Sequence, residues 1–173
     1  MDALGQIDKR DLKELLIKGW MTHDAMWLYH CNEKCGIEKA NEINLAAVLS
    51  MSAIEIQRVK KALGFNKDKI ETFDELADLL IKTMEIVKAD FMRFHWNVSA
   101  KNVLHWEWEG GSCFAYEGVT KLGVIDQYQC GIIKRIEGWL RALGVEYKID
   151  PPIVGCLLHK TGSCKGDFIK QRV

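Results

Sequence analysis

The chain has 173 residues, 48% hydrophobic and 28% charged, which is typical of a soluble globular protein with one sizeable core. Its formal net charge is zero and its pI is about 6.9, which argues against nucleic-acid binding, since such proteins normally carry a basic excess. The N-terminus is charged rather than signal-like and the longest near-apolar run, residues 43–54, is too short to span a bilayer, so we expect one cytoplasmic domain over residues 1–173 with no membrane partner.

The first part of the chain, residues 1–88, has the apolar periodicity of helices. Three helices are expected first, over residues 12–20, 23–34 and 38–63. Thr22 is a suitable cap for the second helix, and Gly36 and Gly64 are expected to end the second and third. Thr72 with Glu75 three residues later has the pattern of a capping box, which predicts a fourth helix to about residue 88.

Residues 89–173 begin with the alternation of strands. Residues 90–109 predict a hairpin that turns at 99–101, and two helices are expected over 113–121 and 125–143. An extended segment then reaches Pro151, and residues 153–170 predict a second hairpin around Gly162. This order indicates an α+β fold in which N-terminal helices pack on an antiparallel sheet built from two hairpins separated by two helices.

Six cysteines without an export signal do not indicate a disulfide framework. Core packing, redox chemistry and metal binding remain as alternatives. Cys31 and Cys35 lie four residues apart on one helical face, where we expect two small buried side chains, because a lone pair lacks the second half of a metal site.

The other four cysteines, Cys113, Cys130, Cys156 and Cys164, fall near the ends of expected elements. Thiolates from separate elements can supply the four ligands that zinc prefers, although the spacing alone equally allows scattered core cysteines. Cys113 follows a glycine turn at the start of a helix, where we expect its pKa to be lowered.

A resemblance rests on these cysteines. The spacing Cys130-x25-Cys156-x7-Cys164, with strands around the last two, resembles the 4-vinyl reductase domain of bacterial phenol sensors and stand-alone archaeal proteins. The segments SCFAYEGVTKLG, YQCGIIKRI and GSCKGDF are also similar to the related L-2-amino-thiazoline-4-carboxylic acid hydrolase-like proteins. The likeness covers residues 89–173.

The resemblance implies a structural zinc ion, because the equivalent cysteines of the phenol sensors hold one together with a glutamate. Ile153 stands at that glutamate's position, so the fourth ligand must differ here. Cys113 is the first candidate, and Glu117 and His159 follow. The resemblance also implies a homodimer.

Two aromatic sets predict either an ordinary core or a small-molecule pocket. The first is a helical stripe of Trp20, His23, Trp27 and His30. The second alternates along the first hairpin and comprises Phe94, Trp96, Trp106 and Trp108. The phenol sensors hold an aromatic ligand with a histidine and a tryptophan, which the resemblance extends to this chain. The expected ligand-binding residues are His23, Trp27, His30, His95, Trp106 and Trp108.

The expected function is that of a sensor or carrier for a small apolar or aromatic ligand, with a structural zinc ion. One alternative is a hydrolase of a small amide or cyclic amino-acid derivative, which uses either Cys113 as nucleophile, with Glu117 assisting it, or a metal-bound water. Another alternative is an assembly subunit that binds no ligand.

Overall fold

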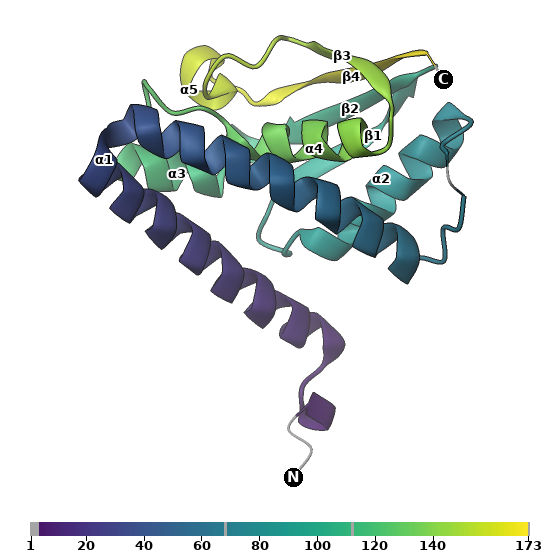
Figure 1. Ribbon diagram of the computed structural model, residues 1–173, viewed down its shortest axis with the longest axis horizontal. Helices are drawn as coiled ribbons and strands as arrows, with labels where there is room; N and C mark the ends of the chain where they lie inside the picture. Colours follow the sequence, from purple (N-terminus) through teal and green to yellow (C-terminus); the bar gives the residue numbers. More distant parts are fainter. Residues whose placement is uncertain (1–3, 68, 112, 173) are drawn as a thin grey trace.

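The computed structural model describes residues 4–67, 69–111 and 113–172 (Figure 1). In chain order the elements are η1 (Leu4–Gln6), α1 (Lys9–Ala62), α2 (Phe73–Val87), β1 (Phe94–Ala100), β2 (Val103–Trp108), η2 (Glu109–Gly111), α3 (Phe114–Lys121), α4 (Gly131–Ala142), β3 (Glu146–Asp150), α5 (Leu157–Thr161) and β4 (Lys165–Arg172). The expected α+β class, with helices on an antiparallel sheet, is confirmed.

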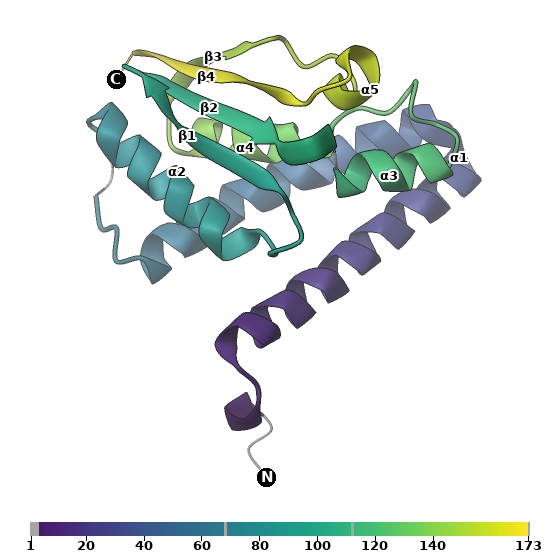
Figure 2. The ribbon, with the colours of Figure 1, turned by 180° about the vertical axis from the view of Figure 1, so that it is seen from behind.

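Helix α1 is sharply bent at Gly36, which divides it into an N-terminal arm (residues 9–35) and a C-terminal arm (residues 37–62) (Figure 1). Gly36 has φ 78° and ψ 164°, a backbone conformation that essentially only glycine adopts. The N-terminal arm extends away from the sheet, whereas the C-terminal arm packs along α4 (Figures 1 and 2). Every buried residue of α1 lies in the C-terminal arm.

The division of the N-terminal arm into two helices was wrong. Its residues form one helix because Thr22 does not act as a cap: the Thr22 hydroxyl donates a hydrogen bond to the Lys18 carbonyl oxygen one turn earlier, at 2.8 Å.

The capping box of α2 is present as predicted. The Glu75 N–H donates to Thr72 Oγ1 at 3.2 Å, and the Thr72 N–H donates to Glu75 Oε2 at 3.3 Å.

The four strands form one antiparallel sheet in the order β1-β2-β4-β3. The first hairpin pairs β1 with β2 as expected and turns at Lys101 and Asn102, so the turn lies slightly later than predicted. The second expected hairpin differs. Residues 153–161 form a loop and α5 rather than a strand, and β4 pairs antiparallel with β3 on one side and with β2 on the other.

Helix α4 begins at Gly131, not near residue 125, because residues 125–127 form a turn and an irregular segment follows to the N-cap Cys130. Helices cover one face of the sheet, and Figure 2 shows the other face uncovered. The core between them includes the fully buried Trp106, Ile56 and Trp139. None of the helices in the described ranges combines the length and the low charge that crossing a membrane requires.

Candidate functional site

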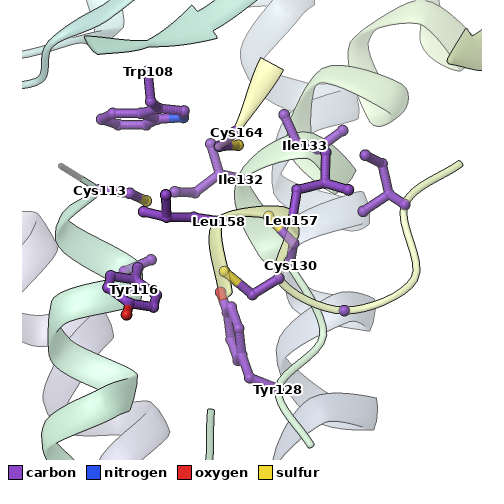
Figure 3. A pocket seen from close by; sticks show the side chains of 14 residues that line it. Trp108, Cys113, Tyr116, Tyr128, Cys130, Ile132, Ile133, Leu157, Leu158 and Cys164 are labelled. Carbon is purple, nitrogen blue, oxygen red and sulfur yellow. The ribbon is translucent and has the colours of Figure 1, made fainter. Parts of the chain in front are cut away.

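Four cysteines line one small cavity where α3, α4, α5 and the start of β4 meet. Cys113, Cys130 and Cys156 are the N-cap residues of α3, α4 and α5, and Cys164 directly precedes β4. Figure 3 shows Cys113, Cys130 and Cys164 around the same space. The cavity volume is about 10 Å³, the space of about one water molecule. Four cysteines that are distant in sequence thus surround a space of roughly ionic size. We refer to these four residues as the four-cysteine cluster.

Burial raises the pKa of three of these thiols: Cys113 to about 12, Cys130 to about 11 and Cys164 to about 12. Backbone N–H groups at the starts of α3 and α4 oppose this at Cys113 and Cys130. The neighbouring thiols raise the pKa values further, because charge on one disfavours charge on the next. The prediction of a lowered Cys113 pKa was therefore wrong for the metal-free protein, since burial outweighs the helix start.

The indole N–H of Trp106, which lies next to Cys164, has no ordinary hydrogen-bond acceptor. The side chain of Trp106 is fully buried. The indole acts on the Cys164 thiol, lowering its pKa against the larger effect of burial. Buried indole N–H groups normally find an acceptor. A thiolate accepts more strongly than a thiol, so this donor fits a deprotonated Cys164.

Four thiols around one cavity, with an indole donor beside them, have the chemistry of a zinc ligand set. Within the described ranges, however, no three His, Cys, Asp or Glu side chains are placed so that they could hold a metal ion. The sulfur atoms surround a common space without forming a ligand set in it. Zinc binding stays a prediction.

The other residues predicted to complete a metal site lie elsewhere. Glu117 is exposed on α3, and His159 Nε2 lies 2.8 Å from Asp126 Oδ1; neither lines the cavity. Ile153 does line it, as an apolar wall. The prediction that Cys31 and Cys35 are both buried was wrong: Cys31 is half-buried and Cys35 is exposed, since the N-terminal arm buries no residue.

A second and much larger cavity, of about 780 Å³, lies between the N-terminal arm and the rest of the molecule. We refer to it as the cleft. Both arms of α1 line it, together with α2, α3, α4 and the segment that leads into β1. The volume falls within the range of known small-molecule sites. The cleft and the four-cysteine cluster share a wall, because Trp108, Ala115, Tyr128 and Ile132 line both cavities.

The far end of the N-terminal arm is held against the segment after α2. Arg10 forms an ion pair with Asp90, and the Glu14 carboxylate accepts a hydrogen bond from the Asp90 N–H. Lys13 Nζ donates to the Glu85 carbonyl oxygen at 2.9 Å. The arm therefore spans the cleft from the bend at Gly36 to this contact.

The cleft wall is rich in methionine and tryptophan. Five of the six methionines line it, namely Met21, Met26, Met51, Met84 and Met92. Four of the six tryptophans also line it, namely Trp20, Trp27, Trp108 and Trp139. Methionine side chains are flexible and polarizable, and they adapt to apolar ligands of different shape. Such a wall favours an apolar molecule over a highly polar one.

A polar cluster interrupts this wall. Arg135 binds Glu55 with two hydrogen bonds, one of them 2.8 Å from Nε to Oε2, and its guanidinium lies 5.0 Å from the Trp20 ring centre. Trp139 Nε1 donates to the same Glu55 carboxylate at 2.9 Å. Asp24 lines the cleft and is accessible to water. Desolvation by the surrounding protein nevertheless raises the pKa of its carboxyl group, and the nearby Arg135 charge partly opposes this effect.

The six predicted ligand-binding residues divide equally. His23, Trp27 and Trp108 line the cleft. His30 lies outside the cleft, beside Glu33 on the exposed arm.

His95 and Trp106 lie outside the cleft too. Because side chains alternate along a strand, His95 lies on the uncovered face of the sheet. Trp106 is fully buried beside Phe168, with the two ring centres 4.8 Å apart. The sequence interpretation missed the methionines, whose irregular spacing gives no motif. It also missed Lys88 and Arg135, because charged side chains on helices are ordinarily solvated.

Comparison with known proteins adds one match. A model of a family of unknown function (DUF6125) matches residues 4–94, which hold α1, α2 and the start of β1. No curated protein matches the chain, and no solved structure does. The match covers the helices that form one side of the cleft and does not reach the four-cysteine cluster.

Proposed function

The chain belongs to this family, DUF6125, whose function is unknown, and from its cleft we propose that it is a sensor or carrier for a small apolar or aromatic molecule. The observation that carries the proposal is the cavity of about 780 Å³ walled by five methionines and four tryptophans. A protein that leaves so much apolar surface around an open space pays a cost in exposed hydrophobic area, which a bound ligand would offset.

The proposal includes a structural zinc ion held by Cys113, Cys130, Cys156 and Cys164. Their shared cavity and the indole donor of Trp106 support this assignment. When bound, the ion would link α3, α4, α5 and β4 and stabilise the thiolate forms of its ligands. Because the cluster shares a wall with the cleft, the same link would stiffen the ligand site. The 4-vinyl reductase resemblance and the homodimer that it implies belong to the same proposal.

The hydrolase alternative has less support. A nucleophilic Cys113 needs its thiolate form, but burial raises its pKa to about 12, so the thiol is protonated near neutral pH. Glu117, its expected helper, is exposed and does not line either cavity. An assembly subunit without a ligand would need a partner chain to cover the apolar cleft.

Binding of the neutral fluorescent dye Nile red tests the ligand site. Gly118 on α3 lines the cleft, and a Cβ built on it meets no atom within 4 Å. Gly118→Phe should therefore place a ring in the cleft and weaken dye binding at least several-fold without lowering the melting temperature. Gly118→Ala is the matched control and should bind as the wild type does. Equal binding by Gly118→Phe would mean that the dye lies elsewhere and would contradict the proposal.

A further inference from the structure

The charges around the cleft give a more specific expectation for its ligand, which rests on the proposed function. Three lysine or arginine side chains line the cleft, Lys18, Lys88 and Arg135, against one acidic side chain, Asp24. Carboxylates outside the lining pair with two of these cations, so the position of each charge matters more than their sum. In an otherwise apolar site, a half-buried cation without a carboxylate partner is complementary to an anion.

The three cations differ in how they are neutralised. Arg135 is engaged by Glu55 in two hydrogen bonds. Lys18 Nζ lies 3.5 Å from Glu14 Oε2. Lys88 donates to the Phe94 carbonyl oxygen at 3.1 Å, and within the described ranges it has no carboxylate partner. A carbonyl oxygen accepts a hydrogen bond but does not neutralise the ammonium charge.

Lys88 occupies a half-buried position beside apolar surface. It follows α2 directly, and Phe91, Met92 and Phe94 near it in the chain also line the cleft. Lys18 lies close to the same place, with Nζ 5.7 Å from the centre of the Phe91 ring. The end of the cleft near Phe91 thus combines ammonium groups with aromatic and methionine side chains. An ammonium in partly desolvated surroundings interacts more strongly with an anion than an exposed one does.

We propose that the cleft binds an amphipathic monocarboxylic acid, whose carboxylate pairs with Lys88 and whose apolar body lies along the methionine-lined wall. The carboxylate of the ligand would neutralise Lys88, as the carboxylates of Glu55 and Glu14 neutralise Arg135 and Lys18. The wall sets only loose limits on the shape of the body, because methionines adapt, so the acidic group supplies the selectivity.

Displacement of Nile red by a matched pair of compounds tests this. The pair is 4-butylbenzoate and 4-butylbenzyl alcohol, which share one apolar body and differ in charge at neutral pH. We expect the acid to displace the dye from the wild-type protein at about tenfold lower concentration than the alcohol, as for a charge-assisted hydrogen bond. Lys88→Met should abolish this preference, because the carboxylate then has no ammonium partner. Lys88→Arg keeps the charge and should restore the preference.

Lys82→Met is the control. Lys82 lies on the same helix but pairs with Asp78 on its exposed face and does not line the cleft, so the preference should persist. Equal displacement by acid and alcohol in the wild type would overturn the assignment of the ligand and leave the proposed function standing. Failure of the dye and of both compounds to bind the wild-type protein would overturn both the assignment of the ligand and the proposed function.

Discussion

Gly138 on α4 lies directly against Ser52 on α1: a Cβ on Gly138 would fall 2.0 Å from Ser52 Oγ. Ser52 is fully buried, and its hydroxyl donates to the Val48 carbonyl oxygen at 2.7 Å. This contact lets the C-terminal arm approach α4 closely, and α4 forms one wall of the cleft. The position of the cleft wall therefore depends on a residue without a side chain.

Gly138→Ala should destabilise the protein by about 1–3 kcal/mol, because an added methyl group in a packed interface forces the two helices apart. The higher helix propensity of alanine, worth up to about 1 kcal/mol, offsets only part of this cost. Urea unfolding measures the change. Gly118→Ala makes the same exchange on α3, where the Cβ meets open space, and should not destabilise. Equal effects at the two glycines would contradict the close contact.

The N-terminal arm should exchange its amide hydrogens faster than the C-terminal arm. Both are regular helix on either side of the non-helical Gly36, but every buried residue of α1 lies after Gly36. Local opening is easier where few apolar side chains are buried. Hydrogen exchange followed by mass spectrometry compares peptides from residues 9–35 with peptides from residues 37–62. Equal protection of the two arms would mean that a second molecule, such as the other subunit of a homodimer, covers the N-terminal arm.

Replacing Cys130 or Cys164 by serine should remove zinc and lower the melting temperature together, if the four-cysteine cluster holds the ion. The wild-type protein, purified without oxygen, should contain about one zinc ion per chain. Serine at Cys31 or Cys35 should change neither quantity, because these cysteines line neither cavity. Elemental analysis and thermal unfolding give the two readings. A wild-type protein with near-zero zinc would reject the metal proposal.

Glu55→Ala should cost about 1–3 kcal/mol, because it leaves the half-buried guanidinium of Arg135 without its partner and also removes the acceptor of the Trp139 indole. Glu55→Gln keeps the size and an acceptor oxygen, so it should cost less. Denaturant unfolding ranks the variants, with Glu42→Ala on an exposed pair as control, expected near zero. A loss from Glu55→Ala no larger than that of the control would contradict the importance of this cluster.

Alkylation by iodoacetamide should follow thiolate content and exposure. In metal-free protein at pH 8, Cys35 should react first because it is exposed. Cys113 and Cys164, whose pKa values burial raises to about 12, should react last, because about one molecule in 10⁴ carries the thiolate at that pH. Mass spectrometry of peptides over time gives the order. Fast, selective labelling of Cys113 would instead support the hydrolase alternative.

Local patterns in the sequence predicted most of the fold. The Thr72 capping box and the first hairpin follow from residue type and short-range spacing, and Gly36 was recognised as a helix end. The cleft could not be predicted from the presence of Gly36, because the relative direction of the two arms depends on the φ and ψ angles of that residue. The second strand pair was misassigned because its strands are separated by α5, whose short apolar run resembles a strand.

The candidate site was only partly predictable for the same reason. Helical spacing put His23 and Trp27 on one face, and both line the cleft. The methionines come from different elements and meet only through the tertiary fold. The four cysteines were expected to converge because each lies near an element end, and they do line one cavity; whether they hold zinc depends on sulfur positions that no spacing determines.

The bend at Gly36 sets the direction of the whole N-terminal arm. The 27 residues of the N-terminal arm measure about 40 Å at 1.5 Å per residue, so a rotation of about 5° at the glycine displaces the tip by about 3.5 Å. Opposing that displacement are an exposed ion pair and two hydrogen bonds at the tip, which are individually weak in water. A small torsional change at Gly36 would therefore alter the width of the cleft along the whole arm without repacking the core.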